Sequence, residues 1–364
     1  MAPGTPTVSH GAEVGSANAA WPVWGHEREA AALRQAIAAG HVSHAYLLSG
    51  PSGVGKRALA LAFAQAVLCQ APDRGDASLP CDVCAACRRI PRGAHPDVEV
   101  YDLALQARLN DRGGKNTTIA IDTVRQLRAA AALRPMEGSR RFIILDDAET
   151  MQETAQEALL KTLEEPPPAV TLILLAADAE ALLPTIRSRC QALGLGLVDA
   201  GAIAVGLAQR GIAPERAREL AGLAQGRPGW ALRAAAEPAL ERERLAEIER
   251  AVEWIAGSRY DRLVAAVRLG DGFAKRRDET FAELETTLGA WRDCLLLRLG
   301  LAEHVAFPGQ AARMAALAGG WATADVLRAI DAVNACLADL ESNVRPKLAT
   351  EVMVLQWPIS ATAA

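Results

Sequence analysis

A glycine-rich loop that ends in lysine offers the clearest chemistry in this sequence. Residues 50–57 read Gly-Pro-Ser-Gly-Val-Gly-Lys-Arg, and they stand between a short apolar run and an apolar helical pattern. Glycines let backbone N–H groups surround a phosphate, the helix N-terminus favours the anion, and the lysine reaches the outer phosphates. The sequence predicts a phosphate-binding loop for ATP or ADP, with these candidate residues: Gly50, Gly53, Gly55, Lys56 and Arg57. The alternative is a glycine-rich turn before a core helix, and whether nucleotide binds stays open at this point.

An arginine stands where this kind of loop normally carries a magnesium ligand. The residue after Lys56 is expected to be Ser or Thr, whose hydroxyl holds Mg²⁺, but it is Arg57. A guanidinium has only donors, so it cannot ligate a cation and would repel one. We therefore expect the metal site needed for hydrolysis to be damaged.

An acidic pair follows an apolar run further along the chain. Residues 142–145 read Phe-Ile-Ile-Leu, and Asp146 and Asp147 come directly after them. In nucleotide hydrolases of this class the first acid holds Mg²⁺, and the second, normally Glu, orients the attacking water. Asp147 is one methylene shorter than Glu. The pattern predicts a Walker B element, and the alternative is a strand end with solvated acids.

Four of the seven cysteines are close together in the sequence. They are Cys69, Cys81, Cys84 and Cys87. Two cysteines separated by two residues can present both thiolates to one tetrahedral ion, at about 2.3 Å. No secretory signal precedes them, which favours metal binding over disulfides. We predict a closed, structural zinc site; the alternatives are free thiols or a redox pair.

Strands and helices are expected to alternate between about residues 24 and 198. The predicted strands are 45–49, 98–101, 141–145, 170–175 and 192–198, and the helices between them include 57–68, 121–133 and 154–163. Such alternation indicates a parallel α/β sheet. From about residue 199 only helical patterns follow, with breaks at Gly211 and at the turn 226–229.

These patterns divide the chain into four parts. We expect a disordered tail at 1–22, an α/β P-loop domain at 23–198 with a zinc insertion at 69–87, a small helical lid at 199–236, and a helical C-terminal domain at 237–364. The tail is predicted from its Ala, Gly, Ser, Pro and Thr content and its lack of an apolar period.

The composition excludes some classes of protein. The net charge is −4 and aromatic residues make up 4% of the chain, which argues against a basic nucleic-acid coat and against a base-stacking surface. No apolar run reaches the ~18 residues of a membrane helix. We therefore expect a cytoplasmic protein without a membrane partner.

Two further motifs carry a family resemblance. Residues 158–167 read Ala-Leu-Leu-Lys-Thr-Leu-Glu-Glu-Pro-Pro, and residues 182–190 end in Ser188, Arg189 and Cys190. With the zinc insertion after the phosphate-loop helix, they resemble the bacterial clamp loader of DNA polymerase III. The resemblance covers about residues 24–357 and is most specific between residues 141 and 190.

The resemblance implies an AAA+ fold with a five-stranded sheet and a C-terminal collar domain. Clamp loaders of this kind are hetero-pentamers of motor subunits (gamma/tau), a delta subunit and a delta-prime subunit. They use ATP to open the sliding clamp and place it on primed DNA at the replisome, near the nucleoid. The Ser-Arg-Cys motif implies that Arg189, with Ser188 and Cys190, supplies an arginine finger to a neighbouring subunit's ATP. Without the motif, Arg189 would be taken for an ordinary surface arginine.

Four departures from the family pattern separate the motor type from the delta-prime type. Arg57 replaces the magnesium ligand, and Asp147 replaces Glu. The resemblance places the γ-phosphate sensor at Ala176 or Ala177, and the second sensor at Gly229, although Arg227 and Arg233 lie nearby. None of the residues at these sensor positions has a hydrogen-bonding side chain.

We therefore expect a delta-prime, stator-like subunit that belongs to the polymerase holoenzyme but lacks a complete catalytic site of its own. Two alternatives stay open. One is an ATP-hydrolysing motor subunit or another AAA+ ATPase. The other is a zinc-dependent nucleic-acid-binding module with a vestigial phosphate loop.

Overall fold

The chain folds into two compact units, of which the first ends at Gly196 and the second begins at Leu197. The computed structural model describes residues 21, 23–71, 76, 78–109, 118–342 and 344–359. The tail predicted at 1–22 lies outside the described residues except for Trp21. That indole is buried, and its Nε1 donates to the Ser78 carbonyl at 3.0 Å. The indole therefore finds both an apolar site and a hydrogen-bond acceptor, and the extent of the tail stays a prediction.

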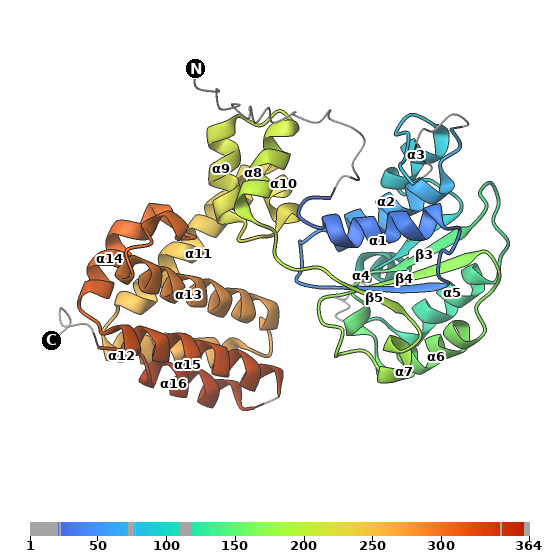
Figure 1. Cartoon of the computed structure of the whole chain (residues 1–364). Helices are drawn as coiled ribbons and strands as arrows, with labels where there is room; N and C mark the ends of the chain where they lie inside the picture. Colours follow the sequence, from blue (N-terminus) through green and yellow to red (C-terminus); the bar gives the residue numbers. More distant parts are fainter. Residues whose placement is uncertain are drawn as a thin grey trace, which may run out of the picture. The chain divides into compact units, whose positions relative to one another are not determined.

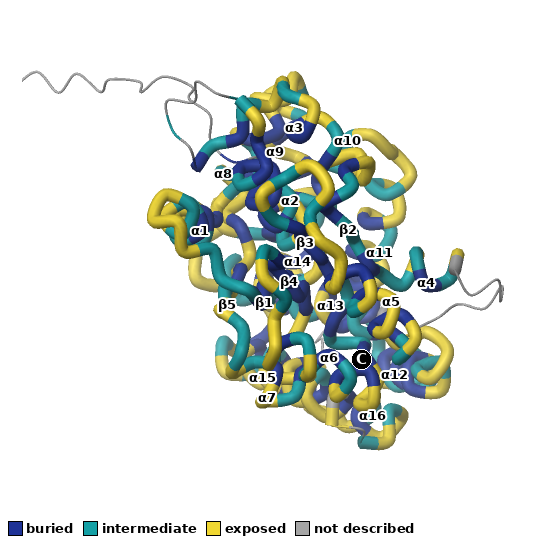
Figure 2. The backbone as a smooth tube through the Cα atoms, turned by 90° about the vertical axis from the view of Figure 1, so that its right-hand side faces the viewer, coloured by how far each residue is buried: buried dark blue, intermediate teal, exposed yellow. Residues whose placement is uncertain are grey.

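The first unit is built on a parallel sheet in the order β2-β3-β4-β1-β5. Its strands are β1 (Ala45–Ser49), β2 (Val98–Tyr101), β3 (Arg141–Leu145), β4 (Val170–Ala176) and β5 (Gln191–Gly194). The expected α/β class with a five-stranded parallel sheet is confirmed. Figure 2 shows the central strands as buried segments, which explains why their sequences are apolar on both faces.

The fifth strand is shorter than predicted. It begins one residue earlier than the predicted 192–198 and ends at Gly194. The Leu195 N–H still donates to the Ser49 carbonyl at 2.7 Å, but the chain then leaves the sheet, and Val198 N–H donates to Gly226. Two glycines, Gly194 and Gly196, weaken the strand here because they bring no side chain to pack.

Alternate side chains of the central strands enter two different cores. In β3, Phe142 and Ile144 pack with the helices α1 (Glu27–Ala38) and α2 (Lys56–Leu68). Ile143 and Leu145 pack on the opposite face, with the helices α5 (Ile121–Ala131), α6 (Glu153–Glu164) and α7 (Pro184–Arg187). Figure 1 shows these two helix layers on either side of the sheet. The smaller helices are α3 (Ala85–Arg89) and α4 (Leu103–Leu109), with single turns at Ile90–Arg92 and Ala148–Thr150.

The second unit is helical throughout its described residues. Its helices are α8 (Ala200–Gln209), α9 (Pro214–Leu223), α10 (Pro228–Ala236), α11 (Pro238–Ala256), α12 (Arg259–Gly272), α13 (Arg277–Arg298), α14 (Ala311–Gly319), α15 (Thr323–Glu341) and α16 (Pro346–Leu355), with single turns at Ala302–His304 and Pro308–Gln310. Three tryptophans, Trp254, Trp291 and Trp357, stack edge to face in its core. None of the described helices is long and apolar enough to cross a membrane.

The helices predicted as a lid pack within the second unit. Arg227, which precedes α10, pairs with Glu285 of α13 at 2.6 Å. Arg244 of α11 donates to Thr286 of α13 at 2.6 Å and also to Gln225, which follows α9. These contacts join the predicted lid to the predicted collar, so the boundary between them at residue 236 stays a prediction.

Candidate functional site

The phosphate loop connects β1 to α2, as its sequence context predicted. Gly50 has a φ of +145°, and a Cβ there would lie 2.0 Å from the Leu195 carbonyl oxygen. Gly55, the residue before α2, has a φ of +119°. Both positions need glycine, because side chains rarely adopt such angles and the first position has no room for one. The loop is therefore shaped by its glycines and by the chain that follows β5.

Lys56 is turned back onto the loop. Its Nζ donates to the carbonyls of Gly50 at 2.5 Å and Pro51 at 3.2 Å. Burial lowers the pKa of Lys56, while the nearby carboxylates of Glu149, Asp146 and Asp147 act in the opposite direction. The Lys56 ammonium group thus stabilises this conformation of the loop by hydrogen bonds to two carbonyls of the loop.

Arg57 pairs with acids from two other strands. Its Nη1 lies 3.1 Å from Asp102 Oδ2 and 3.7 Å from Asp146 Oδ2. Asp102 follows β2 and Asp146 follows β3, and these neighbouring parallel strands end at the same edge of the sheet. The sequence predicted that Arg57 and Asp146 belong to one site, but it did not reveal Asp102.

The acidic pair lies beside the phosphate loop. Burial, followed by repulsion from Asp146 and Glu149, raises the pKa of Asp147 to about 6. Burial also raises the pKa of Asp146, although Arg57 and Lys56 oppose the shift. Asp147 has a φ of +54°, an uncommon angle for a residue other than glycine. The carboxylates are therefore crowded and incompletely neutralised.

Magnesium, which this type of fold implies, does not fit these residues in the usual way. The hydroxyl that should hold the ion is replaced by Arg57, and the guanidinium already pairs with Asp146. A cation next to that guanidinium would be repelled at short range. At the end of β4, Ala176 accepts a hydrogen bond from Gly50 N–H through its carbonyl, and its methyl side chain cannot contact a phosphate by hydrogen bonding.

Replacing Arg57 with serine is expected to create magnesium binding. The substitution removes the competing cation from Asp102 and Asp146 and supplies the missing hydroxyl. We expect millimolar Mg²⁺ to raise the melting temperature of R57S and to leave that of the wild type unchanged, because a ligand stabilises only the state that binds it. Differential scanning fluorimetry with and without Mg²⁺ measures this. Equal responses of the two proteins would contradict the assignment.

The four clustered cysteines come together as predicted. Their Sγ atoms all lie within 4.8 Å of one another, with 4.0 Å between Cys81 and Cys87 and between Cys84 and Cys69. A tetrahedral zinc ion with Zn–S bonds of about 2.3 Å needs sulfur atoms about 3.8 Å apart. The cluster therefore has the donor set and the spacing of a closed zinc site.

Hydrogen bonds favour a thiolate at one of these cysteines. Burial opposes ionisation of Cys84, but the N–H groups of Cys87 and Gln70 and the neighbouring thiols together lower its pKa to about 6. Burial raises the pKa of Cys87. A zinc ion binds thiolates, so the hydrogen bonds to Cys84 favour the form of that side chain that binds zinc.

Arg189 lies on the surface of the first unit, directly after α7 and Ser188. Its Nη2 pairs with Glu164 Oε1 at 2.9 Å, and its Nη1 donates to the Thr185 carbonyl at 2.9 Å. Burial raises the pKa of the next residue, Cys190, to about 12, so that thiol is inert at neutral pH. The motif thus presents one exposed guanidinium beside a packed cysteine.

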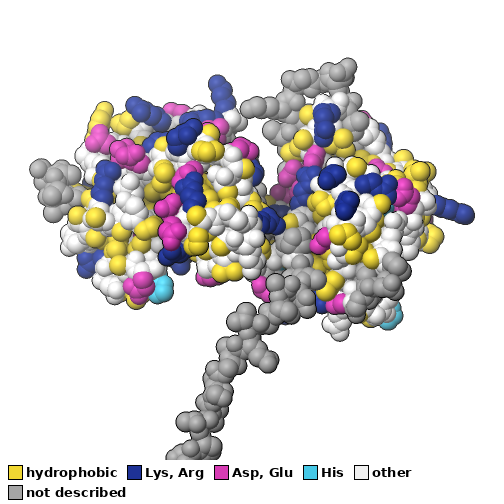
Figure 3. Space-filling model, turned by 90° about the horizontal axis from the view of Figure 1, so that it is seen from above, with side chains coloured by type: hydrophobic (Ala, Val, Ile, Leu, Met, Phe, Trp, Pro, Cys, Tyr) yellow, Lys and Arg dark blue, Asp and Glu magenta, His cyan; other side chains and the backbone are white. Residues whose placement is uncertain are grey.

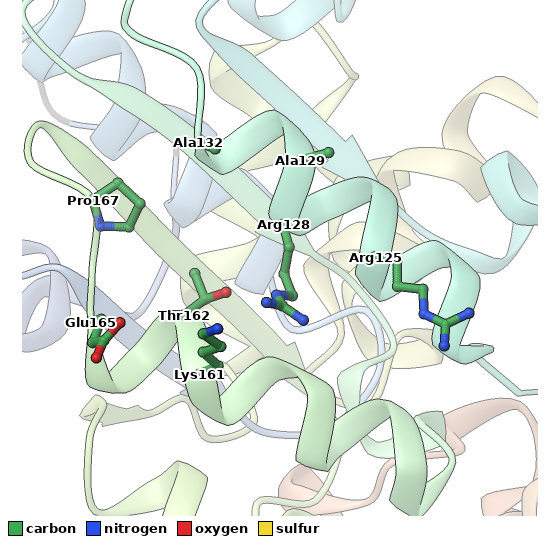
Figure 4. A pocket seen from close by; sticks show the side chains of 8 residues that line it. All are labelled: Arg125, Arg128, Ala129, Ala132, Lys161, Thr162, Glu165 and Pro167. Carbon is green, nitrogen blue, oxygen red and sulfur yellow. The ribbon is translucent and has the colours of Figure 1, made fainter.

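A shallow pocket of about 390 Å³ lies between α5 and α6. Figure 4 shows Arg128 of α5 extending toward Lys161 and Thr162 of α6, with Glu165 at one side and Arg125 further along α5. Lys161, Thr162, Glu165 and Pro167 belong to the motif at residues 158–167, but only the packing of α5 against α6 brings the arginines of α5 beside them. In the sequence alone, the spacing of the polar residues in each helix is typical of an ordinary solvent-exposed helix face.

Comparison with known proteins identifies the first unit. Residues 25–198 match the family described as "DNA polymerase III, delta subunit". A segment of 148 residues is 40% identical to the DNA polymerase III subunit delta' of Pseudomonas aeruginosa, covering 41% of this chain and 42% of the relative. Residues 25–198 belong to the DNA polymerase III clamp-loader family.

Further polymerase III subunits and a solved structure also match the chain. The gamma/tau subunit of Mycobacterium bovis is 35% identical over 167 residues, which cover 46% of this chain and 27% of that protein. The crystal structure of a gamma subunit-related protein from Thermotoga maritima aligns with 90% of this chain and 98% of its own, at 18% identity and a TM-score of 0.38. The chain spans less than half the length of the curated relatives that it matches.

Both subunit types are thus among the relatives of this clamp-loader domain. One relative is named as a delta' subunit and the other as a gamma/tau subunit of the same polymerase. The choice between a delta-prime type and a motor type therefore depends on the chemistry of the site.

Proposed function

We propose that this chain is a delta-prime-type clamp-loader subunit of DNA polymerase III that does not hydrolyse ATP itself. The observation that carries the proposal is the ion pair of Arg57 with Asp146 and Asp102. The residue that should hold magnesium is here a cation, and it engages the acid that should be the second magnesium ligand. Without that metal, the phosphate loop lacks the charge that neutralises a transferring phosphoryl group.

The second part of the proposal is that Arg189 acts on nucleotide bound by a neighbouring subunit. The Arg189 guanidinium lies at the surface within a Ser-Arg-Cys motif, where its N–H donors can reach a phosphate held by another subunit. The partners would be the gamma/tau motor subunits and the delta subunit of a hetero-pentamer, and through them the sliding clamp and primed DNA in the bacterial cytoplasm. The zinc ion would be structural, since four cysteines leave no open coordination position.

The motor type is the second candidate, supported by the gamma/tau relatives. A nucleic-acid-binding module has less support. Figure 3 shows basic side chains interspersed with acidic ones over the face it draws, whereas electrostatic binding of a nucleic-acid backbone requires clustered cations.

ATP turnover by the purified full-length chain tests the proposal. We expect no turnover above background from the chain alone, with or without primed DNA, because no residue replaces the magnesium ligand. Adding the chain to the other clamp-loader subunits of the same organism should raise their DNA-stimulated turnover and restore clamp loading. Magnesium-dependent turnover by the chain alone would move the protein to the motor type.

A further inference from the structure

The exposed Arg189 guanidinium is held by a carboxylate of its own chain. Glu164, the last residue of α6, places Oε1 2.9 Å from Arg189 Nη2. The Thr185 carbonyl accepts from Nη1 at 2.9 Å, and Ser188 Oγ lies 3.5 Å from the same nitrogen. The side chains of Arg189 and Glu164 are 36% and 51% exposed. The guanidinium is therefore anchored on one side by neutral oxygens and on the other by a full negative charge.

We propose that Glu164 is a positioning residue that holds Arg189 in an inactive arrangement until a nucleotide phosphate displaces its carboxylate. The inference rests on the proposed function, because it concerns the same arginine. A finger works by placing positive charge next to the charge that develops on the transferring phosphoryl group. A carboxylate 2.9 Å from the guanidinium offsets that charge, so the finger must separate from Glu164 to be fully effective.

The chemistry of the two anions makes the exchange feasible. A guanidinium binds a carboxylate and a phosphate oxygen with the same fork of N–H donors. The Nη1 contact to the Thr185 carbonyl can persist during the exchange, because each terminal nitrogen carries two hydrogens. Glu164 thus keeps the Arg189 side chain ordered at the surface and competes with a nucleotide phosphate for the Nη2 donors of the guanidinium.

The exposure of the pair sets the size of the effect. Surface ion pairs of this kind change an equilibrium by at most about 5-fold. Replacing Glu164 with glutamine keeps the shape and the hydrogen-bond acceptor but removes the charge. We therefore expect E164Q to raise the turnover number of the assembled clamp loader by about 1.5- to 5-fold, because removing the charge frees the guanidinium for the transferring phosphoryl group.

The test uses the complete, assembled complex with four versions of this chain. They are E164Q, E165Q, R189A and the double variant E164Q/R189A. Glu165 is the matched control, because it is the next residue and carries the same charge but lines the α5–α6 pocket with Lys161 and Pro167 (Figure 4). E165Q should have wild-type turnover. If Glu164 acts through Arg189, E164Q should have no effect in the R189A background.

The outcomes separate the two proposals. Unchanged turnover in R189A would refute the finger, and with it the basis of the inference. Reduced turnover in R189A, with E164Q equal to the wild type or slower, would refute the role of Glu164 alone. An increase in E164Q that persists without Arg189 would also overturn it, since the effect would then come from α6 itself. An Arg189-dependent increase in E164Q but not in E165Q is the expected result.

Discussion

Replacing Arg189 with alanine is expected to slow ATP hydrolysis at the neighbouring subunit's site by about 10³-fold or more. The figure is typical for the loss of an arginine finger. The guanidinium is exposed and contacts the rest of the chain through Glu164, Thr185 and Ser188. Its removal should therefore leave the first unit folded and the complex assembled. Single-turnover hydrolysis by the complete complex measures the affected site separately from the others.

The matched control is Arg28→Ala, which removes the same charge from an exposed position on α1. It should preserve both assembly and turnover. Gel filtration of the R189A complex distinguishes a defect in hydrolysis from a defect in assembly. Normal single-turnover rates at every site of an intact R189A complex would show that this arginine is not a finger.

Removing a zinc ligand is expected to destabilise the first unit by about 3–5 kcal/mol. Loss of a structural metal is among the few single changes with effects of this size, because the free energy of metal binding contributes to folding. In C84S the remaining ligands are Cys69, Cys81 and Cys87, and Cys87 lies in the core against α2, where its carbonyl accepts from Gln65 at 2.9 Å. Loss of the ion should therefore disturb α2 as well as the loop.

Zinc content and local stability should change together. The wild type, purified under reducing conditions, should carry one zinc ion per chain by elemental analysis, and C84S should carry none. Hydrogen exchange should show lower protection in α2 and α3 of C84S and unchanged protection in α13 and α15 of the second unit. The control C336S changes a buried cysteine of the second unit and should retain its zinc. Full protection of α2 in a zinc-free protein would contradict a structural role.

Much of the architecture could be predicted because short stretches of the sequence are enough to indicate each strand and helix. The strands are short apolar runs bounded by helical patterns, and both faces of the sheet are covered, so the runs are nearly continuous. The end of β5 could not be predicted in this way, because residues 195–198 are as apolar as a strand. Their backbone groups leave the strand ladder although the Leu195 side chain still packs in the core over the sheet: the Leu195 carbonyl lies against Gly50 of the phosphate loop, and Val198 N–H donates to the Gly226 carbonyl.

The candidate site shows the same limit. The spacing within residues 50–57 and within the cysteine cluster is local, and the structure brings each of these groups together. Asp102 was missed, because its approach to Arg57 depends on β2 and β3 being neighbours in the sheet. Glu164 was missed as the partner of Arg189 for a similar reason, since α6 and the residues after α7 meet only through packing. Sequence patterns indicate the reactive groups, but the strand order and the helix packing determine which charged side chains lie next to them.

The close approach of Gly50 to Leu195 makes the phosphate loop part of the path along which the chain leaves the first unit. The Ser49 carbonyl accepts from Leu195 N–H at 2.7 Å, and Gly50 leaves no space for even a methyl group against the Leu195 carbonyl. A displacement of the loop by a phosphate would push directly on Leu195, one residue before the first unit ends at Gly196. The geometry of the phosphate loop and the course of the residues that lead to the second unit are therefore coupled through one close backbone contact.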